Sequence, residues 1–252
     1  MQDPVLLENL TWPQIAEIVA NGESLCVLPV GAIEQHGRHL PCVTDTLFVD
    51  EFCSELSRRT GVPLAPTLRV SSSHAHSTKW PGTFSYPPRF FIEMVCETAR
   101  WVAASGFTKL LIINAHGGNP APLRVAVDEV RRSGQLQVGC VNWFDVTSEI
   151  DGLVTADADD WHANRAETSL MLFLQPGLVD ESAVIDDPDR TAGRVFSYPV
   201  NQTSTDGLTG TPSLATAEEG RQIHALVCAA LVQVVEAARR ENYPDLTSRK
   251  RA

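Results

Sequence analysis

The sequence predicts an α/β fold in which helices cover a largely parallel sheet. Short apolar runs of strand length alternate with longer segments of helical periodicity, and this βαβα order holds for most of the chain. The chain has 252 residues, of which 43% are hydrophobic, so it can bury a full core. No internal repeat or low-complexity tract divides it. We therefore expect a single domain over residues 1–252.

Caps and periodicity place the elements of the first half. Thr11 is a good N-cap and Pro13 suits a first turn, so a helix is expected over residues 12–20, ended by Asn21 and Gly22. The apolar run Leu25–Val30 follows as a strand. The next predictions are a helix over residues 46–59 ending at Gly61, a strand over 63–70, and a long Ser- and Pro-rich loop over 71–88.

The second half continues the alternation and then becomes irregular. The expected elements are a helix over residues 89–105, a strand over 109–114, a helix over 120–133, a strand over 137–142 and a long amphipathic helix over 215–241. Two stretches lack a regular pattern, the acidic residues 147–161 and the loop 186–212. Loops this long in a compact domain usually shape a binding site.

Charge, hydropathy and cysteine usage exclude several classes of protein. The formal charge of −11 argues against a nucleic-acid surface, because phosphate contacts need clustered Lys and Arg and the only basic cluster is residues 249–251. No apolar run approaches the roughly 20 residues of a membrane span, and the N-terminus has no signal-peptide pattern. Six widely spaced cysteines without CxxC indicate reduced, mostly buried thiols. We expect a cytoplasmic protein without nucleic-acid or membrane partners.

The most informative feature is a dispersed set of residues that bind metals. Glu34 and His36 lie two residues apart directly after the apolar run Leu25–Val30, so a strand-like continuation points both side chains to one side. Asp45 follows within one loop length, and His116 comes where another apolar strand ends, which is where ligands gather in open α/β sheets. Carboxylates and imidazoles without thiolate suit Zn²⁺ or Mn²⁺. Asp45 is the candidate bridge between two ions roughly 3.5–4 Å apart.

Residues in and near this set also permit two functions that do not involve a metal. The paired Gly117 and Gly118 of NAHGGN could form a phosphate-cradling turn, but the segment lacks the GxGxxG and GxxxxGK[ST] patterns. Ligation by His116, with glycines that permit close backbone approach, explains the segment better. Cys42 could be a nucleophile, but it is expected to be inert, because no helix N-terminus or basic partner is predicted beside it.

The histidines outside the ligand set are ambiguous on sequence alone. His162 and Glu167 could be a helix cap and an exposed carboxylate, or part of the site. His74 and His76, in the long loop, fit substrate contact and solvent exposure equally well, and His224 lies in the last predicted helix, where a structural role is expected.

Over nearly its whole length the chain resembles the creatininase, or creatinine amidohydrolase, family. The matching segments, in the family's order and spacing, are LPVGAIEQHGRHLPCVTDT, WPGT, NAHGGN, HANRAETSLML and DGLTGTPSLATAEEG. The resemblance implies that the family's metal-binding Glu, His and Asp correspond to Glu34, His36 and Asp45, and its strand-end His to His116.

The chain departs from creatininase itself in the residues around the metals. Gly118 stands where creatininase has a metal-ligating Glu, so the resemblance implies that Glu167 supplies the replacement carboxylate. His162 matches a catalytic His, and Asp159 matches the Asp of a Trp-Asp pair whose Trp position is Ala158. We expect His162 and Asp159 to be catalytic and creatinine to be a poor substrate. The residues expected to contact substrate are His76, Trp80, Gly117, Gly118, Trp143 and Trp161.

The resemblance also implies an activity and an architecture. It implies a three-layer α/β/α fold and a homo-oligomer, commonly a hexamer. The four or five candidate ligands exceed the usual need of one catalytic ion, so we expect about two divalent ions per chain (Zn²⁺, Mn²⁺ or Fe²⁺). The implied reaction is hydrolysis of a C–N amide-type bond of a small molecule, such as a cyclic amide or a formamide, by metal-bound hydroxide. The alternatives left open are a peptidase of a small modified peptide, a hydrolase that opens a cyclic ketone, and a non-catalytic, metal-bound binding homologue.

Overall fold

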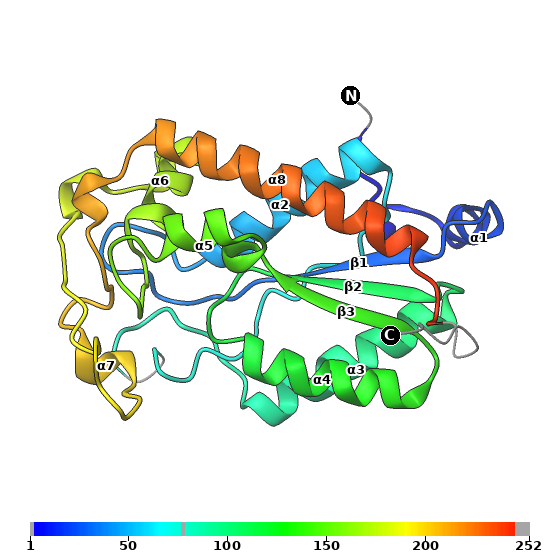
Figure 1. Cartoon of the computed structure of the whole chain (residues 1–252), viewed down its shortest axis with the longest axis horizontal. Coiled ribbons are helices and arrows are strands. Elements are labelled where there is room, and N and C mark those ends of the chain that lie inside the picture. Colours follow the sequence, from blue (N-terminus) through cyan, green and yellow to red (C-terminus); the bar gives the residue numbers. More distant parts are fainter. Residues whose placement is uncertain (1–2, 77–78, 245–252) are drawn as a thin grey trace, which may run out of the picture.

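The computed structural model describes residues 3–76 and 79–244, which form three layers with a parallel sheet in the middle (Figure 1). In this part of the chain the sheet has three strands, β1 (Leu25–Val30), β2 (Lys109–Asn114) and β3 (Gln137–Asn142), in the order β1-β2-β3. One face is covered by α2 (Thr44–Thr60), α5 (Ser148–Val154), α6 (Arg165–Leu174) and α8 (Ala217–Arg240). The other is covered by α3 (Pro88–Ala104) and α4 (Pro120–Ser133). The predicted α/β fold is confirmed.

The register of the sheet brings the ends of all three strands to one edge. Val30 pairs with Asn114, and Asn114 pairs with Asn142, so the carboxyl ends of the strands lie level. The segments that follow β1 and β2 carry the predicted ligands Glu34, His36 and His116. In open α/β sheets the crevice outside these carboxyl ends is the usual place for a ligand.

Side chains of the strands alternate between two hydrophobic cores, because successive residues of a strand point to opposite faces. Val27 packs in the core beneath α2 and α8, whereas Cys26 and Leu28 pack in the core against α3 and α4. Each of the three side chains is fully buried. The site therefore sits on a sheet whose backbone is fixed from both faces.

The strand predicted over residues 63–70 is wrong. This segment makes only isolated bridges, Leu64 with Val27 and Leu68 with Val30, although it runs parallel along the outer edge of β1. Pro29 of β1 and Pro63 provide the physical reason, because proline has no N–H to donate and both residues lie where the ladder between β1 and this segment would need one.

Some predicted loops contain short helices. The stretch over residues 147–161 was expected to be irregular, but it includes α5, which begins where the Thr147 side chain accepts a hydrogen bond from the N–H of Ile150 at 3.3 Å. The loop over residues 186–212 contains α7 (Val200–Thr203), and α1 (Trp12–Ala20) has the bounds predicted. The remaining short elements are 3₁₀ turns at Leu7–Asn9, Trp143–Asp145, Pro176–Leu178, Glu181–Ala183 and Pro212–Leu214.

Helix α8 is long and apolar enough to cross a membrane by length and composition alone. The structure gives it a different environment, because Ile223, Val227, Leu231 and Val235 are fully buried in the core shared with α2 and α6. Such burial is typical of the core helix of a globular domain.

The crossing of α6 and α8 depends on Gly220, and replacing this residue is expected to destabilise the fold. A Cβ atom at Gly220 would lie 1.9 Å from the backbone oxygen of Ser169. Since neither backbone can yield easily, Gly220→Ala should lower the free energy of unfolding by about 3 kcal/mol, the upper end of the usual cost of overpacking. Denaturant unfolding measures this change.

Gly152 in α5 offers the matched control. A Cβ atom there meets nothing within 4 Å, and the residue is exposed. Gly152→Ala should therefore raise the free energy of unfolding by roughly 0.5–1 kcal/mol, since alanine loses less conformational entropy in a helix. Equal stabilities of the two variants would show that α6 and α8 are less closely packed than the structure indicates.

Candidate metal centre and active site

A cavity of about 370 Å³ opens at the carboxyl ends of the strands. Five of the residues predicted to bind metal or act in catalysis line it, Glu34, Asp45, His116, His162 and Glu167, and Asp159 lies on its wall as well. His36 is buried directly behind them and is 1% exposed. Segments far apart in the sequence therefore converge as the ligand pattern predicts.

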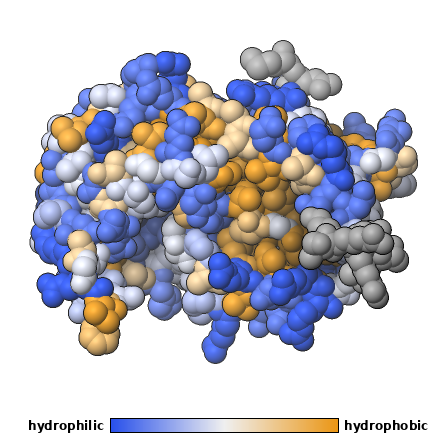
Figure 2. Space-filling view, in the orientation of Figure 1, coloured by the Kyte–Doolittle hydropathy of each residue, from blue (hydrophilic) through white to orange (hydrophobic). Residues whose placement is uncertain are grey.

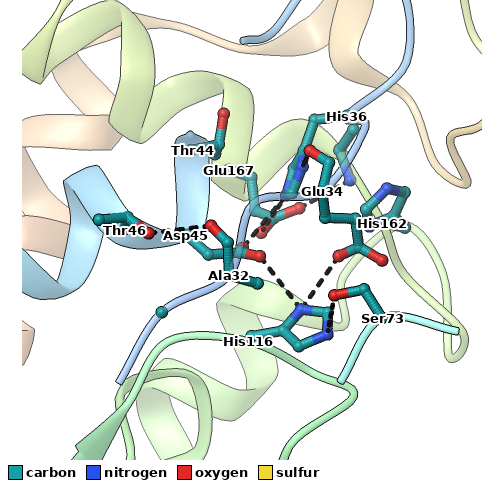
Figure 3. A network of polar contacts seen from close by, with 12 residues as sticks. Ala32, Glu34, His36, Thr44, Asp45, Thr46, Ser73, His116, His162 and Glu167 are labelled. Carbon is teal, nitrogen blue, oxygen red and sulfur yellow. Dashed lines mark hydrogen bonds and ion pairs between the residues drawn. The ribbon is translucent and has the colours of Figure 1, made fainter. Parts of the chain in front are cut away.

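Asp45 lies at the centre of the cluster (Figure 3). It is held at the start of α2, and its two carboxylate oxygens face different imidazoles. Oδ1 lies 3.1 Å from Nε2 of His36, and Oδ2 lies 3.1 Å from Nδ1 of His116. Glu34 Oε2 lies 3.0 Å from the same nitrogen of His116, and Glu167 Oε1 lies 3.7 Å from His36 Nε2.

These contacts define two groups of three candidate ligands that share Asp45. One consists of Glu34, Asp45 and His116, the other of His36, Asp45 and Glu167, and in each the candidate ligand atoms lie within 4.8 Å of one another. A third group combines Glu34 and His36 with His162. A carboxylate shared between two triads has the arrangement of a bridge between two ions.

The hydrogen bonds of the two histidines leave one ring nitrogen of each facing the carboxylates. Nδ1 of His36 lies 2.9 Å from the backbone oxygen of Glu34, to which it can only donate, so Nε2 is the nitrogen with a free lone pair. Nε2 of His116 lies 3.2 Å from the backbone oxygen of Ser72 and 3.1 Å from Oγ of Ser73, which leaves Nδ1 toward Glu34 and Asp45. Such outer contacts commonly fix the ring orientation of metal-binding histidines.

The donor atoms fit divalent cations. Glu34 Oε1, Glu34 Oε2 and Asp45 Oδ2 are buried and accept no hydrogen bond of good geometry within the described residues, with only imidazole nitrogens nearby. A buried carboxylate without compensating partners is costly, whereas the same oxygens are the ligands that Zn²⁺ and Mn²⁺ accept together with imidazole. The chemistry of these donor atoms therefore fits divalent cations.

Without a cation, the carboxylates attract protons to the imidazoles. Burial opposes a charge on His36, but Asp45 and Glu167 outweigh it and raise its pKa well above the usual value. Burial also lowers the pKa of His116, but Glu34 and Asp45 outweigh it and raise this pKa well above the usual value. Burial would raise the pKa of Asp45, but the two histidines hold it well below its usual range.

The raised pKa values of His36 and His116 predict that metal binding releases protons. His36 and His116 carry protons in the metal-free chain at neutral pH because their pKa values are raised, and each nitrogen must lose its proton to bind an ion. Uptake of Zn²⁺ should release about two protons per chain near neutral pH, and affinity should fall as pH falls. Calorimetric titrations in buffers with different ionisation enthalpies measure the release.

His224 provides a control for this titration, because it lies on α8 away from the cluster, beside Glu51. The variant His224→Gln should release as many protons as the unmodified chain, whereas His116→Gln should bind metal more weakly and release fewer. Metal binding without proton release would contradict the assignment of both histidines.

His162 is held by backbone contacts at the edge of the cluster. Its N–H donates to the backbone oxygen of Thr209 at 3.1 Å, and Nε2 of its ring lies 2.8 Å from the backbone oxygen of Gln35. Burial, followed by the neighbouring His76 and His36, holds the pKa of His162 well below its usual value. The ring is therefore neutral at neutral pH and can accept a proton.

Gln35 is a residue of the site that the sequence pattern did not indicate. Its Nε2 lies 2.8 Å from Nδ1 of His76, 3.3 Å from Nε2 of His162 and 2.9 Å from the backbone oxygen of Gly207. It thus joins two imidazoles to a loop far away in the sequence. The assumption of a strand over residues 34–36 hid it, because that assumption points Gln35 away from its neighbours, whereas the segment is not a regular strand.

His76 also belongs to the cluster. Its Nε2 lies 3.0 Å from Oε1 of Glu34, and burial, followed by the charges of His116 and His36, lowers its pKa to about 3. The ring is neutral, with Nδ1 beside the side-chain amide of Gln35 and Nε2 facing Glu34 without a hydrogen bond of good geometry. The sequence left substrate contact and solvent exposure open for His76. The structure does not support solvent exposure, because the side chain faces the cluster.

The residues predicted to contact substrate fall into two groups. His76, Gly117, Gly118 and Trp161 line the cavity. Trp143 does not, and this prediction is corrected: its side chain is fully buried and packs against Phe48 and Phe52 in the core. Its ring also lies 6.5 Å from that of Trp161, so Trp143 supports a residue of the cavity wall from behind.

Trp80 does not line the cavity. The ammonium group of Lys79 lies 4.7 Å from the centre of its ring, and the residue is only partly buried. The cavity residues that the sequence did not indicate, besides Gln35 behind them, are Ala75, Phe144, Asp160, Tyr198, Val200 and Thr209.

Gly118 has no room for a side chain. A Cβ atom at this position would lie 2.5 Å from Nε2 of His116 and 2.8 Å from the backbone oxygen of Ser72. No larger residue could stand here without moving His116. The close approach explains a glycine next to the ligand, as the pattern of NAHGGN indicated.

The segment before α6 is strained in a way that positions Glu167. Ala163 has φ of +47°, a conformation that residues other than glycine seldom adopt, and its N–H donates to Oε2 of Glu167 at 2.6 Å. Asp157 braces the same segment by accepting from the side chain of Asn164 at 2.7 Å and from the N–H of Thr211 at 2.7 Å. Strain of this kind persists only where the surroundings enforce it, and it is frequent at functional sites.

Comparison with known families and structures gives a consistent result. A family model for creatininase, described as creatinine amidohydrolase, matches residues 8–235. The creatinine amidohydrolase of Pseudomonas putida is 29% identical, over 97% of this chain and 99% of its own length. The mycofactocin precursor peptide peptidase of Mycolicibacterium smegmatis is 31% identical, over 80% of each chain.

Solved structures agree with the sequence comparison. A mutant creatininase described as of Zn-Zn type superposes with a TM-score of 0.82 at 26% identity, and the match covers 95% of this chain and 100% of that chain. A structure described as creatininase Mn gives the same TM-score and identity and covers 94% of this chain.

Proposed function

Because the chain belongs to the creatininase family, we propose that it hydrolyses an amide-type C–N bond of a small molecule with two divalent metal ions. Glu34, Asp45 and His116 would hold one ion, and His36, Asp45 and Glu167 the other. The observation that carries the proposal is the position of Asp45, with one oxygen toward His36 and the other toward His116.

Zn²⁺ and Mn²⁺ are the ions we propose. Both accept the mixture of carboxylate and imidazole that the cluster offers, and similar solved creatininases are described as Zn-Zn and Mn forms. When bound, such ions supply two kinds of chemistry, since they acidify a water molecule toward neutral pH and polarise a carbonyl oxygen. The chain's own residues would provide the rest.

His162 is our candidate for the transfer of the proton. Its neutral ring can accept a proton at Nδ1 while Nε2 remains engaged with the backbone oxygen of Gln35. It would take up the proton that the attacking water loses and deliver it to the leaving nitrogen. The backbone oxygen of Gln35 holds the ring, and Thr209 holds the backbone of His162, which together keep the ring in one position.

The cavity limits the substrate. At about 370 Å³ it has room for a small molecule or for the end of a chain, and Phe144, Trp161 and Tyr198 offer flat apolar surfaces beside the polar cluster. Asp159 lies exposed at the rim, where we propose that it binds a polar group of the substrate. Its position at the rim favours recognition over proton transfer at the metals.

A turnover screen tests the proposal. Metal-loaded protein is incubated with lactams, formamides and short peptides, with and without a chelator, and products are identified by mass spectrometry. A product that gains one water, formed only with metal present, is the expected result. Metal-loaded protein that hydrolyses nothing while it binds these compounds would support the non-catalytic alternative.

Creatinine is expected to be a poor substrate within this screen, hydrolysed at least about tenfold more slowly than the best amide. The resemblance to creatininase implies a ligand where this chain has Gly118 and an aromatic residue where it has Ala158. Gly118 cannot be replaced by a carboxylate without displacing His116, so the first coordination shell itself must differ. Creatinine turnover equal to that of the best amide would contradict this expectation.

A peptidase is the second candidate. It is favoured by the 31% identity with a peptidase of a peptide precursor, and by the open side of a cavity that the end of a peptide could enter. Within the screen, short peptides with an aromatic or branched terminus separate the two candidates. Preferred cleavage of these over lactams and formamides would favour the peptidase.

A further inference from the structure

The side-chain amide of Gln35 has one orientation that satisfies its neighbours. Oε1 accepts from the N–H of Gly37 at 3.1 Å, and Nε2 donates to the backbone oxygen of Gly207 at 2.9 Å. Exchanging the oxygen and the nitrogen would set two acceptors against each other at Gly207 and two donors at Gly37. Gln35 is only 4% exposed, so these contacts are shielded from water. The nitrogen of the amide is therefore the atom that faces His76.

Gly207 permits this close contact. It has φ of +76°, and a Cβ atom there would lie 2.7 Å from Cδ of Gln35 and 2.8 Å from its Nε2. A side chain at this position would push the amide out of place. The loop at Gly207 and the side chain of Gln35 thus fit each other, although they are 172 positions apart in the sequence.

The orientation of the amide decides where the proton of His76 lies. Nδ1 of the ring is 2.8 Å from Nε2 of Gln35, and an amide nitrogen can only donate a hydrogen bond. Nδ1 must therefore accept, so the ring is neutral and its single N–H is at Nε2. A protonated ring would set two N–H groups against each other at this contact.

His162 has its proton on the same ring atom but leaves a different atom free. Its Nε2 lies 2.8 Å from the backbone oxygen of Gln35, which can only accept, so Nε2 carries the proton and Nδ1 has the free lone pair. The centres of the two rings, His76 and His162, are 4.3 Å apart. Gln35 thus fixes two neighbouring imidazoles, one with a free lone pair and one with a free N–H.

The N–H of His76 is available to a ligand. In the part of the chain that the structure describes, Nε2 makes no hydrogen bond of good geometry, although Oε1 of Glu34 lies 3.0 Å away. The side chain of His76 is 13% exposed and lines the cavity. Leaving a donor unpaired in so sheltered a place is costly, and an acceptor on a bound ligand would remove that cost.

The surroundings of this N–H select a polar partner. His76 borders the carboxylates and imidazoles of the metal cluster at the carboxyl ends of the strands. The large hydrophobic area on the face drawn in Figure 2 lies between α8 and α4, toward the amino ends of the strands, and so away from His76. Because Nε2 lies beside Glu34, a candidate metal ligand, its N–H points to where the reacting group of a substrate would bind.

We propose that His76 is a catalytic residue whose Nε2–H donates a hydrogen bond to the carbonyl oxygen of the substrate, and that Gln35 is the residue that positions it. This inference rests on the proposed amide hydrolysis. A neutral imidazole can serve as such a donor without giving up its proton. Donors fixed in advance toward an oxygen that gains charge are among the largest contributions to catalysis.

The step balances without a proton from His76. As water adds to the carbonyl carbon, the π electrons of the C=O bond move to the oxygen, and the N–H of His76 stabilises the charge that forms there. Nδ1 of His162 takes the proton that the water loses. When the C=O bond forms again, the C–N bond breaks and the leaving nitrogen receives that proton from His162.

Nuclear magnetic resonance of the chain with ¹⁵N-labelled histidine, with Zn²⁺ and without, tests the arrangement and needs no turnover. His76 is expected to show a protonated Nε2 and an unprotonated Nδ1. Gln35→Glu should reverse this, because a carboxylate in place of the amide nitrogen accepts a hydrogen bond from Nδ1. The signals of His224, which lies on α8 beside Glu51, should stay unchanged and are the internal control.

Two substitutions of His76 separate donation from packing. His76→Phe keeps a ring without a donor and should lower kcat for the best amide of the screen by about 10²–10³-fold, with KM nearly unchanged. His76→Gln places an amide N–H near the position of Nε2 and should recover most of this loss. His74→Phe is the matched control, since His74 is exposed in the same loop and does not line the cavity, and it should keep its kcat. All three variants should keep their Zn²⁺.

Binding of acetohydroxamate to the Zn²⁺-loaded chain gives a further readout that needs no turnover. The probe presents a carbonyl-type oxygen that carries negative charge when it is bound. His76→Phe should weaken its Kd at least about tenfold, the usual effect of losing one hydrogen bond to a charged group. His76→Gln should bind it nearly as tightly as the unmodified chain does.

Three results would overturn the proposal. One is a proton on Nδ1 of His76 in the unmodified chain. Another is a folded, Zn²⁺-loaded His76→Phe variant that binds acetohydroxamate as tightly as the unmodified chain. The third is a variant His76→Phe with a raised KM and an unchanged kcat, which would make His76 a binding residue only. If the screen yields no substrate, the proposed amide hydrolysis fails, and the tautomer and the hydroxamate affinity still decide whether His76 is a donor.

Discussion

Asp45→Asn is expected to remove both metal ions and to abolish turnover. One oxygen of Asp45 faces His36 and the other faces His116, so the residue belongs to both ligand triads. An amide offers one neutral oxygen where a bridge needs two anionic ones. Loss of the ions removes several kcal/mol of transition-state stabilisation, which corresponds to a fall in kcat of roughly 10³-fold or more. Elemental analysis and the best substrate of the screen measure both effects.

Asp50→Asn is the matched control, because Asp50 lies on the same helix and contacts Thr67 and Arg69 instead of the cluster. It should keep both ions and its activity. Asp45→Asn should remain folded, since it removes a buried charge whose partners are two histidines that can lose their protons. An Asp45→Asn variant that retains two ions per chain would show that the bridge lies elsewhere.

Variants of His162 and Glu167 are expected to differ in which property they lose, activity or metal. His162→Ala should lower kcat by about 10²–10⁴-fold, the usual contribution of a positioned proton transfer, and keep its metal. Glu167→Ala should instead lose the ion held with His36, because Glu167 is 2% exposed and directs Oε1 toward that histidine. Metal content and kcat measured on the same preparations distinguish the two roles.

The reverse result would exchange the roles. His162 forms a candidate ligand group with Glu34 and His36, so loss of metal in His162→Ala together with retention in Glu167→Ala would identify His162 as the ligand. His224→Ala serves as the control, since it removes a histidine outside the cavity. If His162→Ala and Glu167→Ala both keep full activity, the segment over residues 162–167 does not take part in the reaction.

Much of the fold could be predicted from the sequence because the signals are local. The three strands match their predicted bounds, and so do helices α1 and α4. The segment after Gly61 could not be assigned correctly, because its apolar residues suggest a strand while Pro29 and Pro63 prevent a continuous ladder with β1. Propensity and hydrogen bonding conflict there, and hydrogen bonding decides.

The candidate ligand set could be predicted from the sequence for a similar reason. Glu34, His36, Asp45 and His116 each follow or begin a regular element, and the parallel register brings these ends together. The neighbours of the ligands were not accessible, because Gln35 and Thr209 act through loops whose path depends on tertiary contacts. Trp143 was misplaced since an aromatic residue after a strand can face the core or the cavity, and only the packing of Phe48 and Phe52 decides between them.

Anomalous diffraction from crystals of the chain loaded with Mn²⁺ or Zn²⁺ tests the central claim most directly, because it locates each ion without reference to activity. We expect two peaks per chain, separated by roughly 3.5–4 Å, with Asp45 between them. One peak should lie among Glu34, Asp45 and His116, and the other among His36, Asp45 and Glu167. A single peak, or a pair of peaks that Asp45 does not bridge, would contradict the two-ion site.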